Sequence, residues 1–366
     1  MAPRSKIRFT LGIHEGPSGI GDQLFQTQLL YSLGRACGWS YVHDTSPRPW
    51  INRDQPGPPR RGFDYHRFLG LAVGEATVAE VSSPRFFDVD SKQVLELLLT
   101  QRGAAPEIMG YSGGPNELVR IWFNSWFYFE YPKVPASRAL PCTQLMNLRR
   151  KYLDARKRDP VALPFSRGRI PIVVFLRLMD LVWYEEDGEI VLPAMPDPLK
   201  LFSTWVTPPA RCLPLVRALV EELGADRCEI WVYSDGIPDR RWLMARMRGI
   251  GRYPADDIDA VSRRVIEFQQ QQMRLFETCG APTRFRVKSS TRVIREVIHA
   301  FSAAPFALAR RAAGMAGHRW EAAFPDLGVR DPGLLPVVRV TEHDPRSLIA
   351  LVRDFRSRSR RPLRWR

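Results

Sequence analysis

Residues 6–43 read KIRFTLGIHEGPSGIGDQLFQTQLLYSLGRACGWSYVH, and this stretch gives the clearest indication of the fold. Residues 6–13 alternate in the manner of a β-strand, and a glycine-rich turn follows them. Apolar side chains then recur at helical spacing over residues 22–37, and residues 39–43 have the pattern of the next strand. A strand, a turn, a helix and a second strand in this order predict the opening of a parallel α/β sheet.

The second half of the chain repeats this theme, beginning with the apolar run at 170–176, which is typical of a buried parallel strand. We also expect strands at 228–233, 284–288 and 337–340. Helices are expected at 94–100, 144–157, 213–223, 241–247, 258–276, 291–301, 305–313 and 347–355. The repetition predicts an α/β protein of two Rossmann-like domains that face each other across a cleft, with ligands at the carboxyl ends of the strands.

The length of 366 residues also favours two domains, because single hydrophobic cores rarely grow to this size. Residues 158–168, with two prolines and a glycine, are the predicted junction. We therefore expect an N-terminal Rossmann-like domain over 1–160 and a C-terminal one over 165–343, followed by a helix and a basic tail over 344–366.

The net charge of +15 attracts phosphates, whether these belong to nucleotides, nucleic acids or anionic lipids. No zinc finger, RNP motif or helix-turn-helix pattern accompanies it, so no specific nucleic-acid partner is expected. The five cysteines form no CxxC pair and resemble reduced core thiols of a cytosolic protein. The six histidines form no HExxH pair, so no metal site is expected.

Both ends of the chain bear on its location. The first residues have a short basic start without the apolar run of a signal peptide, and the apolar run at 118–131 is too short and too polar to span a bilayer. The arginine-dense end at 356–366 can contact the inner face of a membrane, although a solvated tail is the favoured interpretation. We expect a cytoplasmic protein, with peripheral membrane contact as an option.

Three segments can carry chemistry, and each follows a predicted strand. The first is the loop at 16–26, whose small residues let a ligand approach the backbone and the start of the following helix; it contains Gly16, Gly19, Gly21, Asp22 and Gln23. The second ends in Arg177 and Asp180, where a guanidinium can bind a diphosphate. The third ends in Ser234 and Asp235, which can bind ribose, base or phosphate. A tight turn, a surface ion pair and ordinary turn chemistry are the respective alternatives.

Together the three segments resemble the α-1,2-fucosyltransferases and their protein O-fucosyltransferase and Nod-factor fucosyltransferase relatives. Gly-Ile-Gly-Asp-Gln-Leu-Phe-Gln at 19–26 is similar to the GGxGNQLFQ opening of that superfamily, Phe-Leu-Arg-Leu-Met-Asp at 175–180 to its HxRRGD segment, and Val-Tyr-Ser-Asp-Gly at 232–236 to its F-S-D-D segment. Its late Ser-Ser-Phe-Ser segment has a worn counterpart that begins at Ser302. The resemblance extends from about residue 7 to residue 310.

The resemblance implies a GT-B glycosyltransferase that moves fucose from GDP-fucose to an acceptor hydroxyl with inversion, without a metal or other cofactor. The N-terminal domain would then take the acceptor, and the C-terminal domain the nucleotide sugar. Arg177 would neutralise the leaving diphosphate, Asp180 would orient that guanidinium or a hydroxyl, and Glu15 is the candidate general base. The acceptor stays open between a glycan, a lipid and a peptide.

Departures from the superfamily pattern leave a second class of function open. Asp22 stands where Asn is usual, Phe175 where His is usual, and Leu178 where a second Arg is usual. These changes are compatible with a non-catalytic protein that binds a nucleotide or a glycan, and with a transferase that uses another nucleotide sugar.

Overall fold

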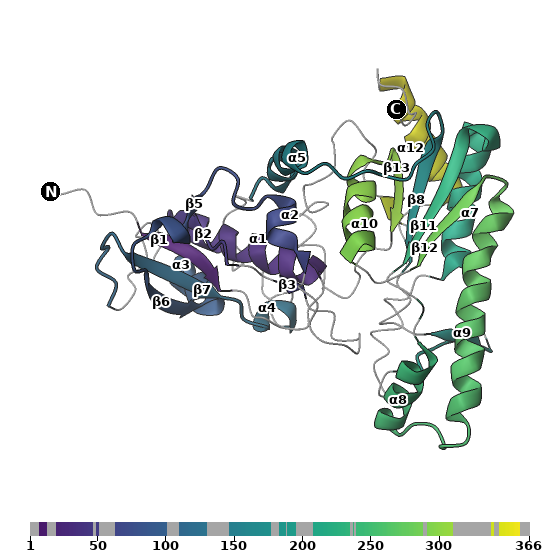
Figure 1. The fold of residues 1–366 in the computed structure, drawn as a ribbon, viewed down its shortest axis with the longest axis horizontal. Coiled ribbons are helices and arrows are strands. Elements are labelled where there is room, and N and C mark those ends of the chain that lie inside the picture. Colours follow the sequence, from purple (N-terminus) through teal and green to yellow (C-terminus); the bar gives the residue numbers. More distant parts are fainter. Residues whose placement is uncertain are drawn as a thin grey trace. The chain divides into compact units, whose positions relative to one another are not determined.

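The computed structural model divides the chain into two compact units between Pro160 and Val161, whose helices and strands are shown in Figure 1. The residues that the structure describes are 7–12, 20–46, 49–50, 63–100, 110–129, 146–176, 183–187, 189–194, 208–234, 237, 239–287, 291–309, 338–339 and 344–358.

The first unit contains a parallel sheet with strand order β5-β2-β1-β7-β6. Its strands are β1 (Arg8–Gly12), β2 (Ser40–His43), β5 (Ala76–Thr77), β6 (Arg85–Asp90) and β7 (Glu117–Trp122). Its helices are α1 (Ile20–Ala36), α2 (Tyr65–Leu69), α3 (Ser91–Thr100), α4 (Trp126–Phe129) and α5 (Leu148–Arg158). A short 3₁₀ helix (Val78–Glu80) and an antiparallel pair, β3 (Pro49–Trp50) with β4 (Phe63–Asp64), complete its described elements. The predicted opening of strand, helix and strand is confirmed.

Helix α1 packs closely on the centre of this sheet because it carries a glycine there. A Cβ at Gly34 would lie 2.4 Å from the ring of Phe9, which is fully buried in β1. The Phe9 ring also contacts Tyr41 on β2, with 5.4 Å between the ring centroids. Any side chain at position 34 would therefore push the helix away from the strand.

The second unit contains a parallel sheet with strand order β12-β11-β8-β13-β14. Its strands are β8 (Ile170–Leu176), β11 (Cys228–Ser234), β12 (Thr283–Val287), β13 (Phe306–Ala309) and β14 (Val338–Arg339). Its helices are α7 (Pro209–Leu223), α8 (Arg240–Ile250), α9 (Ile258–Arg274), α10 (Thr291–Ala303) and α12 (Pro345–Arg358). Its smaller elements are an antiparallel pair, β9 (Tyr184–Glu186) with β10 (Glu189–Val191), and 3₁₀ helices at Ala225–Arg227 and Leu275–Cys279. The predicted α/β class and parallel strands are confirmed for both units.

Strand β8 is buried on both faces, and for this reason its sequence is continuously apolar. Ile172 and Val174 pack on one side with residues of α7 and α12. Val173 packs on the other side with Trp231 of β11 and with Ala300 of α10. Helix α12 is thus part of this core through Leu348 and Val352, so the predicted C-terminal segment 344–366 begins inside the second unit.

The prediction of a helix over residues 305–313 is wrong. Phe306–Ala309 is strand β13, which pairs with β8. Phe306 and Leu308 point to one side of the sheet and Ala307 to the other, and all three are fully buried. A short strand that is buried on both faces has no alternation, so periodicity cannot distinguish it from a helix. Residues 310–313 lie outside the described ranges.

Candidate functional site

The order of the strands reverses at β1 in the first sheet and at β8 in the second, and in the first sheet it changes direction again between β7 and β6. Strand β1 lies between β2 and β7, and strand β8 lies between β11 and β13. In doubly wound sheets ligands bind at the carboxyl ends of the strands on either side of such a reversal. Strands β1 and β8 are the strands that precede the first two predicted ligand-binding segments. The glycine-rich segment follows β1, and the segment with Arg177 follows β8.

In the first unit the glycine-rich segment joins β1 to α1. Gly21, Asp22 and Gln23 lie in the first turn of α1, which begins at Ile20, two residues earlier than the predicted helix. The first amides of a helix have no partner within it and favour anionic or hydroxyl oxygens. Glu15, Gly16 and Gly19 lie outside the described residues.

In the second unit Leu176 is the last residue of β8. Leu176 pairs with Ser234, the last residue of β11, so β8 and β11 end side by side. Ser234 itself is buried, with 1% of its surface exposed. Arg177, Asp180 and Asp235 lie outside the described residues.

The structure separates Ser302 from these strand ends. Helix α10 starts after the carboxyl end of β12 and ends before the amino end of β13, and Ser302 is in its last turn. The residue therefore lies at the amino edge of a parallel sheet, opposite the edge where Ser234 ends β11. It is buried, and its hydroxyl donates to the carbonyl of Ile298 at 2.6 Å. Donor binding by Ser302 stays a prediction, and its position at the opposite edge of the sheet gives it no support.

A buried polar cluster near the carboxyl end of β11 has no counterpart in the sequence-based expectations. The hydroxyl of Tyr233 donates to Oε1 of Glu296 on α10 at 2.8 Å, and Nε of Arg286 on β12 lies 3.3 Å from the same oxygen. The Arg286 guanidinium lies 5.1 Å from the ring centroid of Trp231. Burial, followed by the contact with Glu296, raises the pKa of Tyr233, which stays a neutral donor. The cluster fixes α10 against β11 and β12. Its members are far apart in the sequence, so no local pattern predicts it.

The first unit brings together two histidines that look scattered in the sequence. His43 ends β2, His66 lies on α2, and their ring centroids are 5.5 Å apart. Both side chains are buried, and Nδ1 of His43 lies 2.8 Å from the hydroxyl of Tyr41. Because β2 is the neighbour of β1, this pair lies at the carboxyl edge of the sheet, beside the strand that precedes the glycine-rich segment.

Four of the five cysteines are core thiols, as the sequence predicts. Cys37, Cys212, Cys228 and Cys279 are buried and free. Burial raises the pKa of Cys212 to about 12 and that of Cys228 to about 11. Thiols with such pKa values are weak nucleophiles at neutral pH, so these residues serve packing. Cys142 lies outside the described residues.

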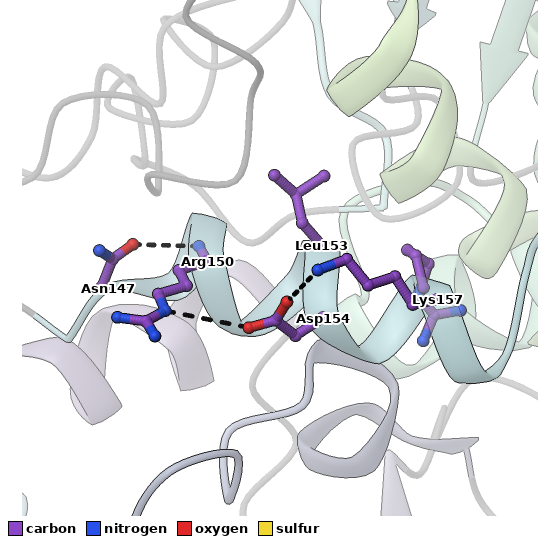
Figure 2. A pocket seen from close by; sticks show the side chains of 6 residues that line it. Asn147, Arg150, Leu153, Asp154 and Lys157 are labelled. Carbon is purple, nitrogen blue, oxygen red and sulfur yellow. Dashed lines mark hydrogen bonds and ion pairs between the residues drawn. The ribbon is translucent and has the colours of Figure 1, made fainter.

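A surface groove of about 630 Å³ runs along α5 in the first unit (Figure 2). Its described lining includes Arg150 and Lys157, both ion-paired with Asp154, and the exposed Leu153. None of these side chains follows the carboxyl end of a strand, so the groove is not assigned to the predicted ligand sites.

Neither a metal site nor a membrane span is found in the described part of the chain. Among the described residues no three His, Cys, Asp or Glu side chains gather in a group suited to a metal ion. Within the same residues, no helix has the length and apolar character needed to cross a membrane. Comparisons of the chain with protein-family models, with curated proteins and with solved structures found no significant match.

Proposed function

We propose that the protein is an inverting, metal-independent glycosyltransferase of the GT-B type that transfers fucose from GDP-fucose to an acceptor hydroxyl. One observation carries the proposal: Arg177 directly follows β8, the strand at which the order of the second sheet reverses. This is the position at which α/β sheets bind nucleotides. The glycine-rich segment follows the corresponding strand, β1, of the first sheet.

The second unit is the proposed donor half. Arg177 would bind the diphosphate of the donor, because a guanidinium matches two phosphate oxygens at once. Asp180 would orient the guanidinium or a sugar hydroxyl, and Asp235 would bind ribose or base from the adjacent strand end. The buried Ser234 would support the turn that carries Asp235. The proposal requires the two sheets to face each other across a cleft.

In the proposed reaction, the acceptor oxygen attacks C1 of fucose from the side opposite the diphosphate. The bond between C1 and the β-phosphate oxygen breaks, and its electron pair leaves with GDP. Arg177 neutralises the charge that grows on this oxygen, which lowers the barrier. The acceptor proton goes to a general base, for which Glu15 is our candidate. The proposed location is the cytoplasm, where thiols stay reduced.

A thermal-shift panel of GDP-, UDP- and ADP-sugars tests the donor. A ligand that binds only the folded state raises the melting temperature, and at 100 times its Kd it stabilises by about 2.7 kcal/mol. We expect GDP-fucose to give the largest shift. A larger shift with a UDP- or ADP-sugar would replace the donor, and no shift with any of them would refute the proposal.

A transfer assay then tests activity with the variants Arg177→Ala and Glu15→Gln. The matched control is Arg167→Ala, an exposed arginine beside the amino end of β8. We expect Arg177→Ala to lose at least 100-fold in turnover, Glu15→Gln to lose 10-fold or more, and the control to match wild type. Binding of GDP without transfer or donor hydrolysis by the wild-type protein would instead identify a non-catalytic nucleotide-binding protein.

A further inference from the structure

Arginines gather on one face of β12, the strand at the edge of the second sheet (Figure 1). Arg284 pairs in register with Trp231 of β11, and Arg286 pairs with Tyr233. Residues that are paired across strands, or two apart along one strand, point to the same side of a sheet. Arg284 and Arg286 therefore lie on the side against which α10 packs, with their Cα atoms about 6.6 Å apart along the strand.

Arg286 is oriented by the buried cluster but keeps most of its donors. Its Nε lies 3.3 Å from Oε1 of Glu296, and its guanidinium carbon lies 5.1 Å from the ring centroid of Trp231. In the described part of the structure these contacts use one of the five N–H groups of the guanidinium. The side chain is 41% exposed, so its terminal nitrogens can reach an anion in solvent.

Two further arginines extend this group. Arg284 is exposed, and the described residues give its guanidinium no ion pair. Arg295 directly precedes Glu296 on α10 and is partly exposed. We call Arg284, Arg286 and Arg295 the β12 cation surface.

The surface stays positive when the acids around it are counted. The segment 161–169, β11, β12 and α10 together contain six arginines and two glutamates, a surplus of four positive charges. The glutamates are Glu229 and Glu296, and both are buried. Glu229 accepts from the backbone N–H of Ser166, and Glu296 accepts from the hydroxyl of Tyr233. The exposed charges of these elements are therefore cationic.

A row of arginines along an edge strand suits a linear polyanion. A nucleic acid carries its phosphates in such a row, and a guanidinium matches two phosphate oxygens at once. Helices that bind a lipid surface insert an apolar face, whereas the large apolar side chain that is exposed among the described residues is Leu153 of the first unit. Trp231 is buried, so bases cannot stack on it and read-out of the sequence is not expected.

We infer that the β12 cation surface binds the phosphate backbone of a nucleic acid without regard to its sequence. Fluorescence anisotropy of a labelled DNA duplex of about 20 base pairs, at salt concentrations from about 50 to 200 mM, measures the Kd of the full chain and its salt dependence. Two duplexes of different sequence should bind with the same Kd.

Each lost phosphate contact lowers the slope of log Kd against log salt by about 0.9. We therefore expect Arg284→Gln and Arg286→Gln each to lower the slope by about 0.9 and to raise Kd about 5-fold at the lowest salt concentration. Arg286→Lys keeps the charge and should keep the slope. Arg284→Gln keeps the test valid if Arg286→Gln fails to fold, because Arg284 is exposed and lies outside the buried cluster.

The matched control removes two exposed arginines from α8, as the double variant Arg241→Gln/Arg248→Gln. It should keep the wild-type slope, whereas Arg284→Gln/Arg286→Gln should lower the slope by about 1.8. Equal losses in the two double variants would show that net charge alone causes the binding, and would overturn the inference.

Three other results would also overturn it. One is the absence of duplex binding by the wild-type chain. Another is binding that is lost on deletion of residues 359–366 while the β12 variants keep the wild-type slope, because the tail would then be the binding segment. The third is binding to phosphatidylserine vesicles that depends on Arg284 and Arg286 while duplex binding does not, because the partner would then be a membrane. The inference is independent of the proposed function, since these variants leave Arg177 intact.

Discussion

The two units contain sheets of the same kind but attach their outer helices by different means. In the second unit α12 packs on α7 through the buried Leu348 and Val352. In the first unit α5 packs through the buried Leu148 and Tyr152. It is also attached by cations, because Lys151 and Arg156 are buried and bind the segment around α2. A change of side-chain shape in an apolar contact lowers stability in small steps. A buried cation, in contrast, depends on every one of its partners for its stability. The first unit is therefore the half that is more sensitive to single polar substitutions.

The largest effect is expected from removing the buried ammonium of Lys151. Its Nζ lies 2.8 Å from Oε1 of Glu75 and donates to the carbonyl of Leu71 at 2.9 Å. Lys151→Ala leaves these groups without their cation and should destabilise the first unit by about 3–5 kcal/mol, as seen for broken buried ion pairs. Urea denaturation measures the loss. The control Lys157→Ala, with a side chain 76% exposed, should change stability by less than about 0.5 kcal/mol.

The apolar counterpart in the second unit is Leu348→Ala. Leu348 is fully buried, so its truncation should cost about 2–4 kcal/mol through lost burial and a cavity. The same denaturation experiment should show this loss in the second unit alone. A loss larger than that of Lys151→Ala would reverse the contrast between the two units.

A smaller effect is expected at the contact between α1 and β1. Gly34→Ala places a Cβ 2.4 Å from the ring of Phe9, which must move in a packed core. Overpacking of this kind costs about 1–3 kcal/mol, offset in part by the higher helix propensity of alanine. Gly249→Ala on α8 is the control, because a Cβ there meets nothing within 4 Å. Equal melting temperatures of the two variants would contradict the close packing of α1.

The smallest effect is expected at the surface pair that joins α12 to α7. Hydrogen bonds from Arg353 lower the pKa of Glu222 below its ordinary value of 4.5. A lowered folded-state pKa stabilises the protein above pH 4.5, and this contribution is lost as the pH falls through the folded-state pKa. Glu222→Gln should therefore cost at most about 1 kcal/mol at pH 7 and nothing at a pH well below the folded-state pKa. Stability curves at both pH values check this, and an equal cost at both would contradict it.

How much the sequence could predict depends on whether the deciding contacts are local. Strand β8 was predicted with its observed bounds, because an unbroken apolar run of this length between polar flanks is typical of a buried parallel strand. Strand β13 was missed because a shorter buried run carries no period. Local patterns predict ligand positions at the carboxyl ends of β1 and β8, and these stay predictions. The place of these strands at the strand-order reversals could not be predicted, because it depends on which strands pair.

Other features of the sites depend on register and on long-range packing. Arg286 lies beside Tyr233 because β11 and β12 pair in one particular register, although 52 residues lie between them in the chain. His43 and His66 meet through the placement of α2 against β2. The position of Ser302 could not be predicted for a related reason: its worn motif is local, but the direction of α10 places the residue at the other edge of the sheet.

The most direct test of the central claim is the Kd for GDP, measured by calorimetry on the wild type, Arg177→Ala and Arg167→Ala. A charge-assisted hydrogen bond contributes about 1.5–3 kcal/mol, which corresponds to a factor of about 10 to 150 in Kd. We predict that Arg177→Ala weakens GDP binding at least 10-fold while Arg167→Ala leaves it unchanged. Equal affinities of wild type and Arg177→Ala would contradict the assignment of the diphosphate to the end of β8.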